Sequence, residues 1–353
     1  MSENSKPLVS VIMPVFNRRQ DLVVAIESIL DQTVQDFELI IVDDGSTDGS
    51  TRVTEEYAKR DRRIILRPHP HNLGLVTALN NALKYARGKY IARMDQDDLS
   101  VPNRFQRQVE YMNAHSDVDI CGAWMEIIGE PSGTGWRYPE DHDAIYARMF
   151  FTSAMAHPTV MMKSEALRAH SLWYDVRAPH AEDYDLWSRA LPIVRFANIP
   201  EFLLRYRLHA TNTGKIHGDS RRLTRIMIYR RLLSRLEIEP SEIDLLLHEK
   251  IGLYQYQQDT KFLIQARHWL EQLGLANQRL RLIIPDALDR ELSEHWTRIC
   301  SATSVLPQHT ALHILQSSLH YKNVHGLRKI IRSLVFLFSK IIRRFFVKQD
   351  RKL

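Results

Sequence analysis

Apolar and polar positions alternate in regular blocks over the first third of the chain. Short, nearly continuous apolar runs are separated by segments with helical spacing. The predicted strands are residues 8–15, 37–42, 63–66 and 89–94, and the predicted helices are 21–30, 51–59, 75–87 and 103–115. Buried strands that alternate with helices predict a parallel sheet covered on both faces. In such sheets, ligands bind beyond the carboxyl ends of the strands.

The pattern changes twice further along the chain. After Trp124 it loosens, and short predicted strands mix with one helix until about residue 215. Helical spacing then dominates. The predicted strands are 159–162, 193–197 and 202–206, and the predicted helices are 181–190, 221–236, 242–251, 262–273, 287–299 and 311–321. We therefore expect an α/β domain over residues 1–216 and a helical region over 217–325.

The basic excess of the chain lies in its last segment, residues 326–353. From Arg328 onward there are nine basic residues and one acid, whereas the rest of the chain carries 39 basic and 41 acidic residues. A nucleic-acid-binding protein would need a basic face on its folded body. Because the body here is close to neutral, nucleic acid is not an expected partner.

The same segment separates its residue types when it is placed on a helix. Ile and Phe side chains such as Ile341 and Phe345 fill one arc, and Arg and Lys side chains such as Arg343 and Arg344 fill the other. This pattern is typical of a helix that lies in a bilayer interface and is attracted to anionic lipid. A helix that packs on the domain or on a second subunit is the other interpretation.

Composition narrows the class of protein. The 353 residues are 44% hydrophobic, which is enough for a real core and excludes a mainly disordered chain. Neither of the two cysteines has metal-ligand or disulfide-framework spacing, so a reducing, cytoplasmic setting is expected. The polar start predicts no signal peptide, and no apolar run is long enough to span a membrane. Together with the tail, this predicts a peripheral protein at the inner face of the cell membrane.

Acidic clusters directly follow two of the predicted strands. Asp43 and Asp44 begin the first, where turn and helix-capping chemistry is an equally good interpretation. The second contains Asp95, Asp97 and Asp98, whose carboxylates repel one another unless a cation lies among them. A hard divalent ion with oxygen ligands, Mg²⁺ or Mn²⁺, suits such a cluster and also binds substrate phosphates. Glu182 and Asp183 form a third acidic site at a predicted helix start, an ordinary place for acids.

In this order and spacing, these motifs resemble the nucleotide-diphospho-sugar glycosyltransferases of the GT-A fold, specifically the large inverting family 2. The resemblance covers roughly residues 7–209. Its motifs are Val9 to Asn17, Glu27 to Thr33, Phe37 to Ser46, Asn72 to Leu75, Ala86 to Asp98, Pro102 to Arg104, and Glu182-Asp183. It implies a Rossmann-like, mostly parallel sheet with helices on both faces.

The resemblance also implies roles for individual residues. On the donor side, residues that match the family's nucleotide-binding positions are Pro14, Phe16, Asn17, Asp43 and Asp44. Asp95 and Asp97 match its DxD motif, with Asp97 as the metal ligand and Asp95 nearer the ribose. Asp183 matches the catalytic base, which deprotonates the acceptor hydroxyl during a single inverting displacement. Glu182 would contact the acceptor.

Other positions are less specific. His209 falls where related enzymes place a basic loop near the diphosphate, although a structural histidine is an equally good interpretation, and His157 is a weaker candidate. Leu79 stands where the family often has an arginine. The chain has no Gln-x-x-Arg-Trp element, which favours addition of one sugar over polymerisation.

We therefore expect an inverting, metal-dependent glycosyltransferase that moves one hexosyl or N-acetylhexosaminyl group from a UDP-sugar to a lipid-linked glycan. The alternative is a non-catalytic, membrane-associated assembly or regulatory protein that keeps the fold. A nucleotide-dependent oxidoreductase is disfavoured, because Met13 to Arg18 lacks the GxGxxG phosphate loop.

Overall fold

The structure is a computed structural model that describes residues 6–129, 134–209 and 218–302. The predicted helix over 311–321, the amphipathic segment 326–353 and the predicted boundary at 216/217 lie outside these residues. The chain divides into two compact units. The first holds residues up to Ile145 and Ser153–Arg225, and the second holds Tyr146–Thr152 and the residues after Arg225.

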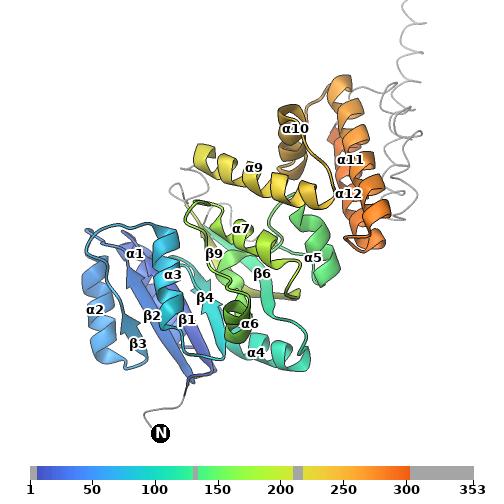
Figure 1. Ribbon diagram of the computed structural model, residues 1–353. Coiled ribbons are helices and arrows are strands. Elements are labelled where there is room, and N and C mark those ends of the chain that lie inside the picture. The colour runs from blue at the N-terminus through green and yellow to red at the C-terminus, as the bar shows by residue number, and fades with distance from the viewer. Residues whose placement is uncertain (1–5, 130–133, 210–217, 303–353) are drawn as a thin grey trace, which may run out of the picture. The chain divides into compact units, whose positions relative to one another are not determined.

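The first unit is a mixed α/β structure (Figure 1). Two of its helices continue into the second unit, namely α5 and α9. Its elements in chain order are β1 (Val9–Val15), α1 (Arg19–Leu30), β2 (Phe37–Asp43), α2 (Ser50–Arg60), β3 (Ile64–Leu66), α3 (Leu75–Tyr85), β4 (Tyr90–Arg93), β5 (Leu99–Ser100), α4 (Arg104–Ala114), β6 (Ile120–Gly129), β7 (Gly135–Trp136), α5 (His142–Met149), the 3₁₀ helix η1 (His157–Thr159), β8 (Met161–Lys163), α6 (Ser164–Ala169), α7 (Glu182–Ala190), β9 (Phe196–Leu208) and α9 (Gly218–Arg235).

One sheet organises this unit, with strand order β3-β2-β1-β4-β8-β6-β9-β5 and β7 paired to β6. The first four strands are parallel, as predicted. Strand β8 is antiparallel to both of its neighbours, so β6 and β9 run in the same direction as β4. The carboxyl ends of β1, β2, β4, β6 and β9 therefore lie toward the same side of the sheet, which is the side that the sequence predicts for ligands.

Helices cover both faces of the parallel strands. Alternate residues of β1, such as Val11 and Met13, join a buried cluster with Ile26 of α1 and Phe105 of α4. Helix α3 packs on β1 and β2 with its own buried row, which includes Leu79 (Figure 1). Each strand is thus apolar on both faces, which explains the continuous runs in the sequence.

Strand β9 differs from the prediction, because two short predicted strands are one thirteen-residue strand. Its pairing with β6 shifts register on both sides of Trp124, and Pro200 lies in the irregular stretch between Ile199 and Phe202. Proline cannot donate to the ladder and is tolerated at such bulges. The bulge interrupts the period-two pattern, so the sequence alone reads as two separate strands.

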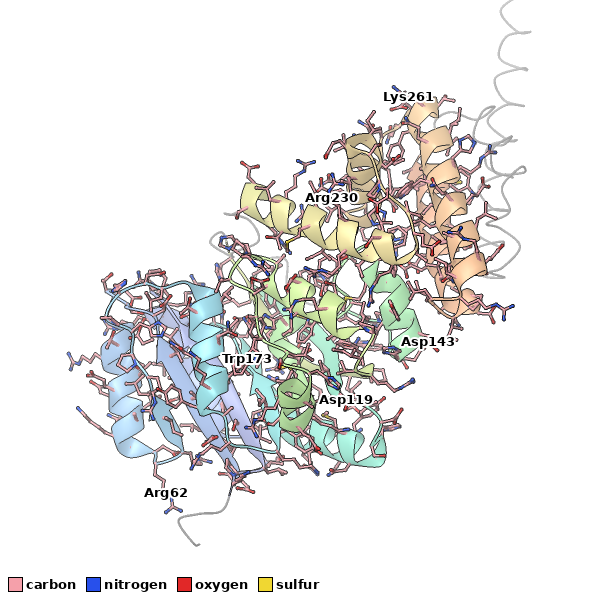
Figure 2. The ribbon with its side chains drawn as sticks, viewed as in Figure 1. Arg62, Asp119, Asp143, Trp173, Arg230 and Lys261 are labelled. Atoms are coloured by element: carbon pink, nitrogen blue, oxygen red, sulfur yellow. The ribbon has the colours of Figure 1, made fainter. Side chains whose placement is uncertain are left out.

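The second unit is helical, in agreement with the predicted helical region. Besides the later part of α9, it contains α10 (Glu242–Gly252), α11 (Thr260–Leu280) and α12 (Pro285–Ala302). Charged side chains such as Arg230 and Lys261 are exposed on these helices (Figure 2). No described helix combines the length and apolar character that a membrane-spanning segment requires.

Candidate active site

Strands β1 and β4 stop pairing before Pro14, near the carboxyl end of β1. This residue is buried in β1 opposite Val42 of β2. On its other side β1 pairs with β4, but that ladder ends at Ile12 opposite Arg93. Because proline has no N–H to donate, it cannot extend the ladder, and the two strands are free to diverge after it.

The residues after β1 are fixed by the neighbouring turn. Asn17 adopts a left-handed conformation with φ of 47°, its N–H donates to Ser46 Oγ at 3.1 Å, and its Oδ1 accepts from Thr47 N at 2.8 Å. Phe16 is 40% exposed. The predicted nucleotide-binding residues of β1 thus lie beside the turn that follows β2.

The two acids after β2 have different surroundings. Both oxygens of Asp44 are used within the protein, because they accept from Leu73 N and Gly74 N at 2.8 Å and Oδ1 lies 2.7 Å from His69 Nδ1. Asp43 Oδ1 accepts from Ser46 N at 3.0 Å, whereas its Oδ2 is buried and has no hydrogen-bond partner among the described residues. Asp43 is therefore the acid of this pair with an oxygen left for a ligand.

The acids after β4 form the predicted cluster. One carboxylate oxygen from each of Asp95, Asp97 and Asp98 lies within 4.8 Å of the other two. Burial and then the charge of Asp95 raise the pKa of Asp97, and burial raises that of Asp98 well above its ordinary value. Ionised carboxylates held this closely are costly unless a cation lies among them.

Protein cations offset part of this charge. Arg93 is buried and forms an ion pair with Asp95. His209 Nε2 lies 2.8 Å from Asp97 Oδ2, and Arg18 Nε lies 3.8 Å from the same oxygen. Asp98 Oδ2 is buried, and within the part of the chain that the structure describes it has no hydrogen-bond partner. An all-oxygen cluster with an unused oxygen fits a hard divalent ion such as Mg²⁺ or Mn²⁺, which Asp97 and Asp98 would hold.

The third acidic site lies at the first turn of α7. Burial and then the neighbouring charge of Asp183 raise the pKa of Glu182 to about 7. Glu182 Oε2 is buried, and none of the described residues forms a hydrogen bond with it. Burial also raises the pKa of Asp183. A carboxylate whose proton affinity is increased in this way is suited to accept a proton from a hydroxyl.

Arg93 connects the third site to the second. Although burial opposes its charge, the ion pair with Asp95 raises the pKa of Arg93 above its usual range. Its charge in turn acts to lower the pKa values of Asp98, Glu182 and Asp183. The acids that follow β4 and the acids that begin α7 therefore lie within electrostatic range of one buried guanidinium, which Asp95 contacts directly.

Comparisons with known proteins show the family to which the chain belongs. The chain matches the profile of Glycosyl transferase family 2 over residues 10–169. It is 35% identical over 228 residues to an uncharacterized glycosyltransferase of Haemophilus influenzae, over 62% of this chain and 71% of the relative. The chain belongs to glycosyltransferase family 2. A second relative is the O-antigen biosynthesis glycosyltransferase WbnJ of Escherichia coli, 34% identical over 222 residues, which cover 61% of this chain and 85% of WbnJ.

Solved structures agree on the fold. The glycosyltransferase resembles the crystal structure of Staphylococcus aureus TarS 1–349 in complex with UDP-GlcNAc with a TM-score of 0.57 and 16% identity, over 95% of this chain and 91% of TarS 1–349. The predicted GT-A architecture is therefore confirmed.

The predicted site residues of this family 2 glycosyltransferase lie in three groups. Pro14, Phe16, Asn17 and Asp43 lie at the ends of β1 and β2, and Asp95, Asp97 and His209 lie at the ends of β4 and β9. Asp183 and Glu182 begin α7. The Asp44 carboxylate instead accepts hydrogen bonds from the turn before α3. The individual roles of all these residues stay predictions.

The surroundings of His157 are those of a structural histidine. Its Nε2 lies 2.8 Å from Tyr174 Oη, and both residues are buried. Burial, together with the charge of Arg93, holds the pKa of His157 well below its ordinary value. A neutral, hydrogen-bonded histidine behind Arg93 supports the site from within the core.

Sequence reasoning missed three residues of the glycosyltransferase site. Arg93 was only part of a predicted strand. The side-chain amide of Gln96 exchanges hydrogen bonds with Phe16, accepting from its N at 2.8 Å and donating to its O at 3.1 Å. Arg207 N donates to Asp98 Oδ1 at 2.9 Å. The one signal available was position, because Gln96 lies between the DxD acids and Arg207 two residues before His209.

Proposed function

We propose that this glycosyltransferase moves one sugar from a nucleotide-diphospho-sugar to a hydroxyl group of a lipid-linked glycan, with inversion at the anomeric carbon. The observation that carries the proposal is that the partly buried Asp183 and the Asp95–Asp98 cluster both lie within electrostatic range of the buried Arg93. One side of such a site can hold a diphosphate leaving group, and the other can accept the proton of the attacking hydroxyl.

The donor half would use the ends of β1, β2 and β4. Asp43 Oδ2 is the unused oxygen that can accept a hydrogen bond from the nucleotide. A divalent ion held by Asp97 and Asp98 supplies charge neutralisation for the diphosphate that leaves. Arg18 adds positive charge beside Asp97, and His209 Nε2 lies 2.8 Å from the same Asp97 oxygen. The donor oxygens would thus meet cations despite the acidic character of the cluster.

The acceptor half would use α7. Asp183 takes the proton from the acceptor hydroxyl, that oxygen forms the new bond to the anomeric carbon, and the bond from the anomeric carbon to the diphosphate breaks. One displacement from the face opposite the nucleotide inverts the anomeric configuration. Glu182, which holds a proton at mildly acidic pH because of its raised pKa, can donate a hydrogen bond to the acceptor.

The pathway and the location are also proposals. The name of WbnJ places that relative in O-antigen biosynthesis, which supports an acceptor from cell-surface polysaccharide assembly. The TarS crystal structures include complexes with UDP and UDP-GlcNAc, so UDP-sugars are the first donors to test. The basic amphipathic segment would keep the enzyme at the cytoplasmic face of the membrane.

The test compares the wild-type protein with Asp183→Asn. Nucleotide sugars are screened with Mn²⁺ against a bacterial membrane lipid extract, and transfer is detected by mass. The amide keeps the shape of the carboxylate but cannot take a proton, so we expect transfer to fall by at least about a thousandfold while donor binding persists. NMR of the product reports its anomeric configuration.

The exposed acid Asp117, which pairs with Arg195, supplies a matched control. Asp117→Asn should transfer at the wild-type rate. Transfer by Asp183→Asn within a few-fold of wild type removes Asp183 from the base role, and a product that retains the donor configuration contradicts inversion. If no nucleotide sugar raises the melting temperature or is consumed, the non-catalytic assembly protein becomes the better interpretation.

A further inference from the structure

An exposed tryptophan lies on the same face of the sheet as a buried apolar row. Strand β7 pairs antiparallel with β6, so that Trp136 is opposite Met125, and in the next ladder Tyr206 of β9 is opposite Ile127. Residues directly opposite one another share a face of the sheet. Met125 and Ile127 are each 3% exposed. Trp136 and Tyr206 therefore project from the face that contributes to the core.

The two aromatic rings form a pair at the outer end of this face. Their centroids are 5.7 Å apart with an angle of 33° between the ring planes. Trp136 is 44% exposed, and Tyr206 is partly buried and packs against the main core cluster. Nearly half of Trp136 is thus exposed to solvent beside a tyrosine ring that packs on the core. An exposed aromatic side chain in this arrangement favours a binding role.

The position of β7 is fixed by a close contact on its other face. A Cβ atom on Gly135 would lie only 2.3 Å from the ring of Phe202, so a larger residue at this position would require that ring to move. The ring of Phe202 lies 5.6 Å from that of Trp124. Trp136 therefore belongs to a strand whose other face packs against the Phe202 ring.

The aromatic pair lies close to both ends of the proposed chemistry. Burial and then the charges of Asp95, Asp98 and Asp97 raise the pKa of Tyr206. Burial and then the charges of Asp183 and Tyr206 raise the pKa of Tyr138, which is two residues after Trp136. Arg207, next to Tyr206 in β9, donates its N–H to Asp98 Oδ1 at 2.9 Å, so the aromatic pair lies beside the acid cluster, and Tyr138 lies within electrostatic range of Asp183.

We propose that Trp136 and Tyr206 are a sugar-binding platform, on which a pyranose ring at the end of the acceptor stacks. The apolar C–H face of a pyranose carries weak positive charge and complements the negative face of an aromatic ring. Its hydroxyl groups would then point past the ring edges toward carboxylates that can accept hydrogen bonds. A prenyl chain has no group for those carboxylates, so the platform contacts the glycan and not the lipid.

This inference rests on the proposed function and deepens it by assigning the acceptor's terminal unit to saccharides. Two measurements test it. Saturation-transfer NMR records binding of octyl glucoside, octyl galactoside and octyl N-acetylglucosaminide, and needs no turnover. Release of nucleoside diphosphate from nucleotide sugars with Mn²⁺, with and without the same glycosides, separates the donor KM from the acceptor KM.

We expect Trp136→Ala to raise the acceptor KM about tenfold and to weaken the NMR signal, while the donor KM stays within about twofold of wild type. Trp136→Phe, which keeps an aromatic face, should recover most of the loss. Tyr85 is a matched control, since it is also 44% exposed but ends α3, which precedes the opposite end of β4. Tyr85→Ala should behave as wild type in both measurements.

The outcomes separate the two proposals. If wild-type protein consumes a nucleotide sugar but Trp136→Ala leaves the acceptor KM unchanged, or raises the donor KM alone, the platform is wrong and the proposed function stands. If no glycoside gives an NMR signal with wild-type protein, the saccharide occupant is wrong. If glycosides bind through Trp136 but no nucleotide sugar is consumed, the platform stands and the proposed transfer reaction fails.

Discussion

Arg93 is the residue on which the arrangement of the site depends. It forms the last pair of the ladder between β1 and β4, opposite Ile12, and only 3% of its surface is exposed. A buried arginine requires acidic partners, and buried acids require a cation. Because Asp95 pairs with it and the charges of Asp98, Glu182 and Asp183 lie within its range, Arg93 and these acids stabilise one another.

The proposed metal ligand gives the first prediction at this scale. In wild-type protein, Mn²⁺ with a UDP-sugar should raise the melting temperature, and Asp97→Ala should lose this shift. Without metal, the variant should melt at the wild-type temperature or above it, since removing an acid relieves the repulsion that contributes to the raised pKa of Asp97. Differential scanning fluorimetry with a Mn²⁺ titration measures both effects.

The control for this variant is Asp117→Ala, which removes an exposed acid from outside the cluster. It should keep the full metal-dependent shift. An Asp97→Ala protein that still responds to Mn²⁺ as wild type does would remove Asp97 from the metal site and leave Asp95 and Asp98 as the remaining candidates.

Glu182 gives a prediction about pH. Its pKa is about 7 in the folded protein against 4.5 for an ordinary glutamate, so folding favours its protonated form. This contribution to stability is fully present below pH 4.5 and is lost as pH rises through 7. Glu182→Gln resembles the protonated form at every pH. Its melting temperature should therefore exceed that of wild type increasingly from pH 5 to pH 8. The corresponding difference in the free energy of unfolding should reach a limit on the order of 3 kcal/mol.

The comparison with Glu55→Gln isolates the effect of burial, because Glu55 is exposed on α2. That variant should follow the wild-type pH dependence throughout. A Glu182→Gln protein with a constant difference from wild type between pH 5 and pH 8 would show that Glu182 is ionised over this whole range.

At the residue scale, the sequence predicts the acids of the site but not their cation. Asp43 and Asp97 follow from strand ends, whereas the role of Asp183 is predicted from the resemblance to family 2. The role of Arg93 depends on its electrostatic range to the acids of α7, a long-range relation with no signal in the local pattern. The same limit applies to Asp44. The sequence does not distinguish it from Asp43, whereas the structure shows that Gly74 N donates a hydrogen bond to its carboxylate.

Among the elements, the turn between α3 and β4 is held by a compact polar contact. Ser10 Oγ of β1 accepts from Gly88 N at 2.8 Å and donates to Glu38 Oε1 of β2 at 2.6 Å, and Arg87 pairs with Glu38. A Cβ on Gly88 would lie 2.6 Å from Ser10 N. Glycine is thus required where β4 enters the sheet beside β1.

Gly88→Ala should therefore destabilise the first unit by about 1–3 kcal/mol, the usual cost of forcing extra atoms into a packed region. Urea unfolding followed by circular dichroism measures the shift. Gly218→Ala, where no atom lies within 4 Å of the added Cβ, is the control and should unfold at the wild-type urea concentration. Equal midpoints for the two variants would mean that the turn relaxes freely.

Most elements of the sheet could be predicted from periodicity, and the failures have local causes. The parallel strands β1 to β4 are buried on both faces, so they give continuous apolar runs. Strand β6 has its outer half only partly buried, and β9 contains the bulge at Pro200. Mixed burial and a broken period make these two strands hard to recognise, although β9 carries Tyr206 and leads directly to His209.

On the scale of the whole molecule, the second unit includes a segment that interrupts the first. Residues Tyr146–Thr152 belong to the helical unit, where Tyr229 Oη donates to Phe151 O at 3.0 Å. A Cβ on Gly252 would meet the same carbonyl oxygen at 2.3 Å, so α10 approaches it closely. A sequence read in order predicts contiguous domains and gives no sign of such an exchange.

The distribution of charge leads to the last prediction. The residues before Arg328 carry a net charge of −2 and the segment from Arg328 carries +8, although the segment itself lies outside the described residues. Each cation near an anionic surface contributes about 1 kcal/mol, which salt screens. The protein should therefore sediment with phosphatidylglycerol-rich vesicles, less so at high salt, and little with pure phosphatidylcholine.

Deleting residues 328–353 should abolish sedimentation with the anionic vesicles, whereas the nucleotide-sugar response of the remaining chain should persist. Two milder variants separate the forces involved. Replacing Arg343 and Arg344 by glutamine should weaken binding and reduce its salt dependence, because fewer cations meet the lipid. Replacing Phe345 and Phe346 by serine should weaken binding at all salt concentrations, because insertion of the apolar face is lost. If the truncated protein still sediments, the helical unit and not the tail would hold the enzyme at the membrane.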